Sequence, residues 1–161
     1  MTANVHLRGA TPDDCELIFQ LITELAIYER EPQAVETTPA VIRGQLESGK
    51  CPFECLIAEL AGEPARFALF FQNYSTWKGR PGLYLEDLFV RESARKSGVG
   101  GALLVALARI AVERGYGRME WSVLDWNQLA IDFYKSLGAF PMSDWTTFRL
   151  TGEPLRELAA R

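Results

Sequence analysis

The sequence predicts an α+β fold of three layers, in which a mixed, mostly antiparallel sheet is flanked by helices on both faces. The first half contains two apolar runs, 53–60 and 66–74, separated by Gly62-Glu63-Pro64, which is typical of an antiparallel hairpin. The second half alternates strand-like and helix-like segments, which favours crossover connections over one sheet. The 161 residues contain no repeat, low-complexity stretch or linker, so we expect a single domain over 1–161.

The N-terminal elements follow from caps and helical spacing. A short strand is expected at Val5–Arg8. Thr11-Pro12 then begins a helix, because threonine is a favourable cap and proline fits the first turn. Its buried face is expected to carry the apolar residues at helical spacing, which are Leu17, Ile18, Leu21, Ile22 and Leu25. Thr38-Pro39 begins a second, shorter helix that ends near Gly49.

The elements of the second half are expected from the same signals. In order they are a loop at Ser75–Gly82, a strand at Leu83–Val90, a helix from about Gly98 to near Gly115, a strand at Arg118–Val123, a helix at Asn127–Leu137 stopped by Gly138, and a last strand at Trp145–Leu150.

The composition excludes several functional classes. A formal net charge of −4 argues against a general binder of nucleic acid or of anionic membranes. No apolar run reaches the length of a membrane span, and residues 1–8 lack the layout of a signal peptide. Three cysteines, Cys15, Cys51 and Cys55, and the single His6 are too few for a zinc site. We therefore expect a cytoplasmic protein with reduced thiols and no metal.

A glycine-rich run lies between the strand and the long helix of the second half. It reads Arg95-Lys96-Ser97-Gly98-Val99-Gly100-Gly101. Glycines let the backbone approach an anion, and the N-terminus of the following helix adds partial positive charge. Arg95 supplies a permanent cation at the mouth of the loop. The run therefore predicts a loop that holds a pyrophosphate.

Other glycine loops fit less well, although a plain connecting turn stays open at this point. A dinucleotide-binding loop needs a third glycine where Leu103 stands, and an acid about twenty residues later. Such loops also begin near the start of their domain, whereas this one lies past the middle of the chain, and Glu120 falls in a strand. The pattern GxxxxGK[ST] of triphosphate-binding loops is absent.

Three motifs in order carry a resemblance to a known family. They are Leu83-Tyr-Leu-Glu86-Asp87-Leu-Phe-Val90, then Arg95-x-x-Gly98-x-Gly100, then Asp125-Trp126-Asn127 with Phe133-Tyr134-Lys135-Ser136-Leu137-Gly138-Ala139. With these motifs the sequence resembles the GNAT superfamily of acetyl-CoA-dependent N-acetyltransferases, and within it the diamine (spermidine/spermine) branch. Weaker echoes are Glu24-Leu25-Ala26-Ile27-Tyr28-Glu29, Trp77 and Trp145.

The resemblance implies acetyl-CoA as co-substrate and a layout that holds it. The strand Leu83–Val90 would be bulged and would splay from 118–123, which makes a slot for the pantetheine arm. Backbone groups of Leu88, Phe89 and Val90 would bond to that arm. The amides of Lys96, Ser97, Gly98, Val99, Gly100 and Gly101 would hold the diphosphate, and Asn127 would face the cofactor from the opposite side. The family also implies a homodimer.

By this resemblance Glu86 is the candidate general base, acting through water. An amine with a pKa near 10.4 is neutral in about one molecule in a few thousand at pH 7, so forming the free amine costs about 4–5 kcal/mol without help. The alternative is that Glu86 and Asp87 are ordinary strand-end carboxylates. In a regular strand the two would point to opposite faces, so at most one of them would line a given wall.

Tyr134 is the candidate acid for the departing CoA thiolate. Proton transfer from a phenol of pKa near 10 to a thiolate of pKa near 8.5 is uphill by about 2 kcal/mol. Tyr134 would therefore act largely by hydrogen-bonding the developing thiolate, unless its surroundings lower its pKa. The alternative is a core aromatic, but neighbouring helix positions point about 100° apart, so Phe133 can be buried while Tyr134 faces the slot.

Acids and aromatics supply the candidates for the acceptor site, through carboxylate pairing and cation–π contact. They are Tyr28, Glu29, Glu31, Trp77, Glu86, Asp144 and Trp145. Considered alone, Glu29-Arg30-Glu31 is typical of a solvated helix end. Ser75 stands where polyamine-type members carry an acid, and Arg30 can oppose a cation or bind a substrate carboxylate. A lysine-like amine therefore competes with a diamine or polyamine as the acceptor.

The leading hypothesis is a small-molecule amine N-acetyltransferase that transfers the acetyl group directly in a ternary complex. The three cysteines lie in no motif typical of a nucleophile, so no acyl-enzyme is expected. Two alternatives stay open, which are a protein or peptide N-acetyltransferase and a degenerate acyl-CoA-binding sensor domain. Retention of Glu86 and Tyr134 argues against the sensor.

Overall fold

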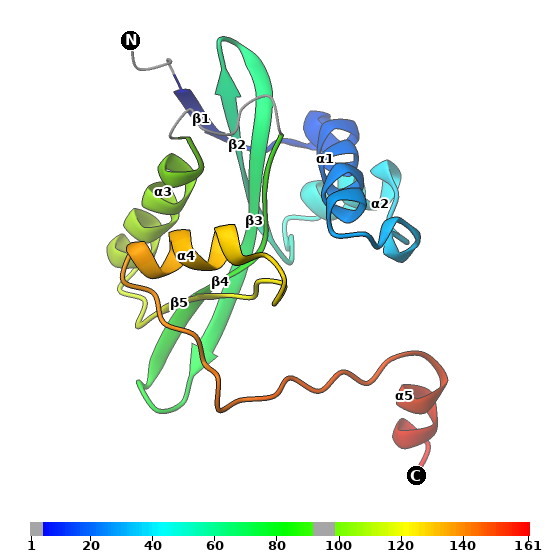
Figure 1. The fold of residues 1–161 in the computed structure, drawn as a ribbon. Coiled ribbons are helices and arrows are strands. Elements are labelled where there is room, and N and C mark those ends of the chain that lie inside the picture. The colour runs from blue at the N-terminus through cyan, green and yellow to red at the C-terminus, as the bar shows by residue number, and fades with distance from the viewer. Residues whose placement is uncertain (1–4, 92–98) are drawn as a thin grey trace. The chain divides into compact units, whose positions relative to one another are not determined.

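The computed structural model describes residues 5–91 and 99–161, which form two compact units (Figure 1). The first unit runs to Ser122 and the second spans Val123–Arg161. No helix in the described ranges is long and apolar enough to cross a membrane.

The first unit is built on a five-stranded sheet with the strand order β1-β2-β3-β4-β5. Its strands are β1 (Val5–Gly9), β2 (Glu54–Leu60), β3 (Glu63–Ser75), β4 (Arg80–Val90) and β5 (Met119–Trp121). Neighbours from β1 to β4 pair antiparallel, and β4 pairs with β5 in parallel. The predicted mixed, mostly antiparallel sheet is therefore confirmed.

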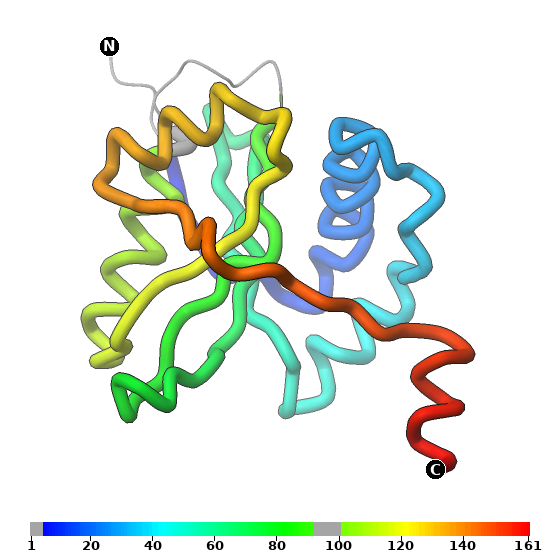
Figure 2. The backbone as a smooth tube through the Cα atoms, turned by 60° about the horizontal axis from the view of Figure 1, so that its bottom comes forward, coloured from blue at the N-terminus to red at the C-terminus, as the bar shows by residue number. Residues whose placement is uncertain are grey.

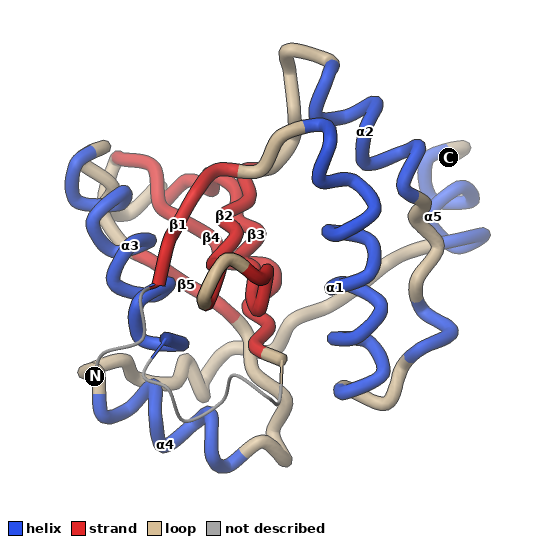
Figure 3. Tube along the Cα trace, turned by 90° about the horizontal axis from the view of Figure 1, so that it is seen from above, coloured by secondary structure: helices blue, strands red, loops and turns tan. Residues whose placement is uncertain are grey.

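Helices cover both faces of this sheet. The helical elements of the unit are η1 (Pro12–Asp14), α1 (Cys15–Tyr28), η2 (Pro32–Ala34), α2 (Pro39–Glu47) and α3 (Val99–Glu113). Figures 2 and 3 show α1 and α2 together on one side of the strands and α3 on the other. The expected three layers are thus present within the first unit.

The core on the α1 side follows the predicted helical spacing. Ile18, Leu21 and Leu25 of α1 are buried, while Leu17 and Ile22 are partly buried at the edge of the same cluster. The strands contribute Cys55, Ile57, Phe67 and Phe89 to this cluster, and α2 contributes Ile42. The cluster fixes α1 against β4, the strand that carries most of the candidate site.

The two predicted helix starts are capped in different ways. Thr38 caps α2 as expected, because its hydroxyl accepts a hydrogen bond of 3.3 Å from the N–H of Val41. At η1 the direction is reversed. There the carboxylate of Asp14 accepts from the backbone N–H and the hydroxyl of Thr11, at 2.8 and 3.1 Å.

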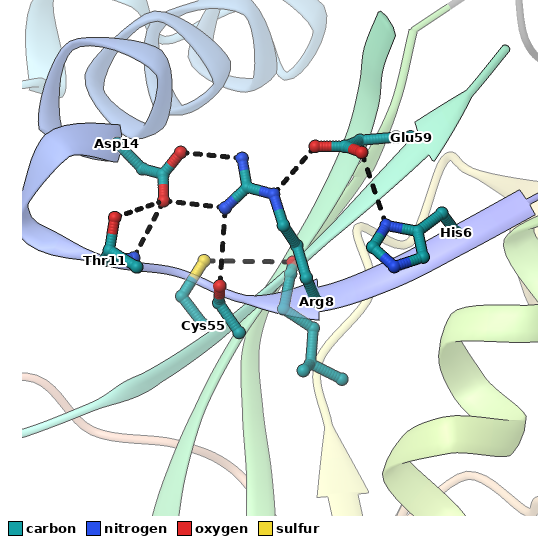
Figure 4. A network of polar contacts seen from close by, with 8 residues as sticks. His6, Arg8, Thr11, Asp14, Cys55 and Glu59 are labelled. Atoms are coloured by element: carbon teal, nitrogen blue, oxygen red, sulfur yellow. Dashed lines mark hydrogen bonds and ion pairs between the residues drawn. The ribbon is translucent and has the colours of Figure 1, made fainter. Parts of the chain in front are cut away.

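The same carboxylate is part of a network that ties β1 to the start of α1 (Figure 4). The Arg8 guanidinium donates two hydrogen bonds of 2.8 Å to the two oxygens of Asp14, and one of 2.7 Å to Glu59. Glu59 also lies 3.4 Å from Nδ1 of His6. Hydrogen bonding to Arg8 lowers the pKa of Asp14 to about 2.

Asp14→Asn should lower the free energy of unfolding by about 1–2 kcal/mol at pH 7, because it leaves the Arg8 guanidinium without its bidentate partner. The folded-state pKa of Asp14 lies below the unfolded one. Its contribution is therefore present above the unfolded pKa near 3.8 and is lost as the pH falls toward about 2. Urea denaturation of both proteins between pH 2.5 and 7 measures the difference.

Asp13→Asn is the matched control for this experiment. Asp13 lies one residue away and pairs with Arg43 at 3.2 Å, but its side chain is 91% exposed. Exposed ion pairs contribute little, so this change should stay within about 0.5 kcal/mol. Equal losses in the two variants would contradict the role given to the buried pair.

The second unit contains α4 (Gln128–Ser136) and α5 (Gly152–Ala159). The predicted helix before Gly138 is confirmed as α4. The predicted last strand at Trp145–Leu150 is wrong, because this stretch has no regular secondary structure and pairs with no strand in the described part of the chain. Residues with strand propensity still need a hydrogen-bonding neighbour to form a strand. Helix α5 was not expected.

Two predicted boundaries in the first unit also change. The expected loop at Ser75–Gly82 is shorter, because β3 continues to Ser75 and β4 already begins at Arg80. Gly82 lies inside the sheet, where an added Cβ would come within 2.5 Å of the side-chain oxygen of Asn73. Glycine at this position marks a close approach rather than a turn. The strand expected at 118–123 is reduced to β5.

Candidate active site

Strand β4 contains one extra residue at Glu86. Leu85 pairs with Phe70 of β3 and Asp87 pairs with its neighbour Leu69, so three residues of β4 oppose two of β3. This arrangement is a β-bulge, and it confirms the predicted bulge in the strand Leu83–Val90. The extra residue interrupts the alternation of side chains. Glu86 and Asp87 are therefore not bound to point to opposite faces, as they would be in a regular strand.

The pairing between β4 and β5 ends next to the bulge. The parallel register covers Leu83–Leu85 of β4, and its last pair joins Leu85 to Trp121, where β5 ends. Strand β4 continues to Val90 in register with β3. Strands β4 and β5 are therefore paired only on the N-terminal side of the bulge, as expected for strands that splay.

The three residues expected to hold the pantetheine arm lie in this continuing part of β4. Leu88 and Val90 are half-buried, and Phe89 belongs to the core cluster on the α1 side. Leu88 pairs with Ala68 of β3. The edge of Leu88–Val90 that faces β3 is therefore occupied by strand pairing. Strand β5 does not extend along the opposite edge of these three residues.

Asp87 is the most perturbed carboxyl group near the bulge. Its side chain is half-buried, and burial raises its pKa to about 6, with further upward contributions from the charges of Glu86 and Glu29. It lies in one cross-strand row with Leu69 and Cys55. Burial first, and then the charges of Asp14 and Asp87, raise the pKa of the Cys55 thiol to about 12. Cys55 is therefore a neutral thiol at pH 7 and a poor nucleophile.

The end of α1 lies near these carboxylates. Glu29 caps the C-terminus of α1, and burial raises its pKa. Arg91, directly after β4, holds this helix in place with two hydrogen bonds of 2.8 Å to Glu24. The structure thus brings Glu29 within electrostatic reach of Asp87, and Tyr28 is the last residue of α1 beside it.

Within one chain, Trp77 does not lie near the carboxylates at the bulge. It lies in the turn between β3 and β4 and is 88% exposed. From Arg80 to Glu86 the strand advances about 20 Å, so the turn that carries Trp77 is separated from Glu86 by about that length of β4. Ser75, where polyamine-type members would carry an acid, is buried and accepts hydrogen bonds from Lys78 N–H and from Arg118.

The remaining side-chain candidates belong to the second unit. Tyr134 is half-buried on α4, and its ring centroid lies 5.7 Å from that of Phe133. Phe133 is 38% exposed, so the expectation that Phe133 is the buried member of the pair is wrong in this structure. Asn127 caps α4 by accepting a hydrogen bond of 3.3 Å from the N–H of Ala130. Asp144 and Trp145 are exposed.

The first four residues of the glycine run, 95–98, lie outside the described residues. The helix expected to follow them is confirmed, since α3 begins at Val99 and includes Gly100 and Gly101 in its first turn. A Cβ added at Gly101 would meet no atom within 4 Å.

Comparison with known proteins identifies the family. The model of the acetyltransferase (GNAT) family matches residues 18–139, which is most of the chain. The chain belongs to this family. The thialysine N-epsilon-acetyltransferase of Bos taurus is 37% identical to it over 171 residues, which cover 99% of each protein. The L-ornithine N5-acetyltransferase NATA1 of Arabidopsis thaliana is 31% identical, with 95% of this chain and 87% of that protein covered.

One solved structure shares the fold over the whole length of the chain. An integron cassette protein from V. cholerae superposes with a TM-score of 0.81 at 26% identity, over 100% of this chain and 99% of that one. The GNAT-like fold expected from the three sequence motifs is therefore confirmed.

The environment of Asp87 in this GNAT chain is not visible in the sequence. The sequence predicts only a strand-end carboxylate next to Glu86, and no sequence signal places Asp87 in one cross-strand row with Leu69 and Cys55. The register of three strands is needed to see that environment. Within the described residues, no group of three or more His, Cys, Asp or Glu side chains is arranged to hold a metal ion.

Proposed function

We propose that this GNAT chain transfers the acetyl group of acetyl-CoA to a primary amine of a small molecule. The observation that carries the proposal is the bulge at Glu86, next to the point where β5 ends, in a chain 37% identical to a thialysine N-epsilon-acetyltransferase. The pantetheine arm lies along Leu88–Val90. Arg95, the amides of 96–101 and Asn127 hold the rest of the cofactor.

The chemical step is a direct transfer between the two bound substrates. The neutral amine nitrogen attacks the thioester carbonyl, the C–S bond breaks, and CoA leaves as the thiolate. The proton of the amine passes through water to Glu86, which is exposed at the bulge. Tyr134 hydrogen-bonds or protonates the thiolate. No cysteine takes part, which agrees with the raised pKa of buried Cys55.

The acceptor is a small cationic amine, of the lysine-like or diamine type. Two relatives are named for thialysine and ornithine, both of which carry a side-chain amine. Tyr28, Glu29 and Glu86 contribute from the first unit, and Asp144 and Trp145 from the second. Ser75 in place of an acid favours lysine-like acceptors over long polyamines. Trp77, which lies far from Glu86 in its own chain, joins the site from a second copy in a homodimer.

The protein acts in the cytoplasm without a nucleic-acid, membrane or metal partner. A screen of acetyl-CoA consumption against diamines, polyamines, lysine analogues and aminoglycosides tests the function. Acetylation of a diamine or lysine analogue is expected. Turnover on peptides alone, or acetyl-CoA binding without any turnover, would contradict the proposal.

Glu86→Gln should slow turnover about tenfold at pH 7 and more at lower pH, because the free amine then forms without a base. The pH dependence of kcat/KM, measured from pH 6 to 9.5, should shift toward higher pH, with the largest loss of rate at the acidic end. Glu63→Gln is the control, since Glu63 is an exposed glutamate at the start of β3. An unchanged pH profile in Glu86→Gln would remove Glu86 from the mechanism.

A further inference from the structure

The hydroxyl groups of Tyr84 and Ser122 contact each other across the strand pair formed by β4 and β5. Their oxygens lie 3.1 Å apart, and either of them can be the donor. Tyr84 is half-buried on β4, and Ser122 is the exposed residue directly after β5. A hydrogen bond between two neutral hydroxyls on an exposed surface contributes little to stability. Stability alone therefore does not explain this pair.

The sheet register places the hydroxyl pair where β4 and β5 separate. The parallel pairing of the two strands ends with Leu85 opposite Trp121. One further step of the same register puts Ser122 opposite Glu86, the extra residue of the bulge. Adjacent strands lie about 5 Å apart. Ser122 and the candidate base therefore lie on the two sides of the split, just beyond the last paired residues.

Both hydroxyls lie on the face of the sheet that carries α1. Tyr84 pairs with Phe71 of β3, and their ring centroids are 5.2 Å apart. Phe71 lies two residues from Leu69, and Leu69 packs against the core cluster on the α1 side. Helix α3, whose start is proposed to hold the diphosphate of the cofactor, lies on the other face (Figure 3). An acceptor that approaches the thioester from the face opposite α3 therefore passes these two hydroxyls.

The groups at the split can orient a relay water. A carboxylate such as that of Glu86 only accepts hydrogen bonds, whereas a water molecule donates two and accepts two. If Glu86 accepts one water proton and a second group accepts the other, a lone pair of the water points at the ammonium group of the acceptor. A serine hydroxyl that donates its own proton to Tyr84 keeps its lone pairs for this purpose.

We propose that Ser122, held by Tyr84, is a positioning residue for the water that carries the amine proton to Glu86. This inference rests on the proposed function. The ammonium group gives a proton to the water, the water gives one of its own to the Glu86 carboxylate, and the neutral amine then attacks the thioester carbonyl. Ser122 accepts the remaining hydrogen bond of the water and neither gains nor loses a proton. Tyr84 fixes the direction of the Ser122 hydroxyl.

Ser122→Ala should lower kcat/KM for thialysine about three- to tenfold at pH 7, because the relay water loses one hydrogen bond. The loss should shrink toward pH 9.5, where more of the amine is already neutral. The Kd for acetyl-CoA should stay within about twofold, and Ser122→Thr, which keeps the hydroxyl, should restore most of the activity. The matched control is Ser48→Ala, which removes a hydroxyl that donates to the carbonyl of Gln45 at the end of α2 and should leave kcat/KM unchanged.

A double variant provides a readout that a merely structural role would not change. In Glu86→Gln the relay has lost its end point, so adding Ser122→Ala should lower the rate less than about twofold further. Tyr84→Phe should cause a smaller loss than Ser122→Ala, with the same dependence on pH. Thermal melts establish that each variant is folded.

Three results would overturn the inference in an enzyme that is otherwise active. They are an unchanged rate in Ser122→Ala, equal losses at pH 7 and 9.5, and losses that multiply fully when Ser122→Ala is combined with Glu86→Gln. A wild type that acetylates no amine at all would instead overturn the proposed function.

Discussion

Tyr134→Phe should lower kcat about 100-fold and leave the Kd for acetyl-CoA within about twofold. A hydrogen bond to a charged group contributes about 1.5–3 kcal/mol, and each 1.4 kcal/mol is a factor of ten in rate. The thiolate charge develops only as the C–S bond breaks. The bond from the phenol is therefore stronger in the transition state than in bound acetyl-CoA, so its loss appears in kcat.

Steady-state kinetics with the best acceptor and calorimetry with acetyl-CoA separate the two quantities. Tyr116→Phe is the matched control, because it removes a tyrosine hydroxyl that bonds to Gln72 at 3.0 Å on an exposed surface. That variant should retain full activity. If Tyr134→Phe retains it too, the thiolate leaves without help from this residue.

The helices and strands of the first unit were largely predictable, because their signals are local. Caps at Thr38 and helical spacing from Leu17 to Leu25 depend on residues within a few turns of each other. The hairpin formed by β2 and β3 follows from a turn between two apolar runs. Boundaries shifted where a strand continued through residues typical of a loop, as at Arg80–Gly82.

The environment of the candidate base was not predictable from alternation. A regular strand separates Glu86 from Asp87, but the bulge inserts Glu86 and leaves Asp87 in register with Leu69. The bulge itself was expected only from family resemblance. Burial first, and then the charges of Glu86 and Glu29, raise the pKa of Asp87, and Glu29 is far away in the sequence and arrives through the packing of α1. Such long-range effects require the folded chain.

In the C-terminal part, the residues favour a strand, but no neighbouring strand is available to pair with them in the described ranges. Trp145–Leu150 is rich in residues that favour strands, and it has no strand neighbour in the described ranges. Helix α5 begins after Thr151, and its Leu155 and Leu158 are exposed. Propensity alone therefore assigned the wrong element to this segment.

Gly100→Leu should raise the Kd for acetyl-CoA at least 100-fold. In the proposed site the diphosphate lies against backbone N–H groups at the start of α3, and glycine permits that approach because it has no Cβ. A leucine side chain would displace the diphosphate from at least two of these donors. Hydrogen bonds to a charged group are worth about 1.5–3 kcal/mol each, so losing two of them weakens binding by about two to four orders of magnitude.

Calorimetric titration with acetyl-CoA measures this loss, and Gly44→Leu is the matched control. Gly44 lies inside α2, where an added Cβ meets no atom within 4 Å. Leucine is a better helix former than glycine, so Gly44→Leu should be at least as stable as the wild type and bind acetyl-CoA normally. Both variants replace a helical glycine with leucine, and only one does so where the diphosphate is proposed to bind. Tight binding by Gly100→Leu would therefore show that the cofactor is held elsewhere, and the assignments of Leu88–Val90 and of Arg95 would have to be abandoned with it.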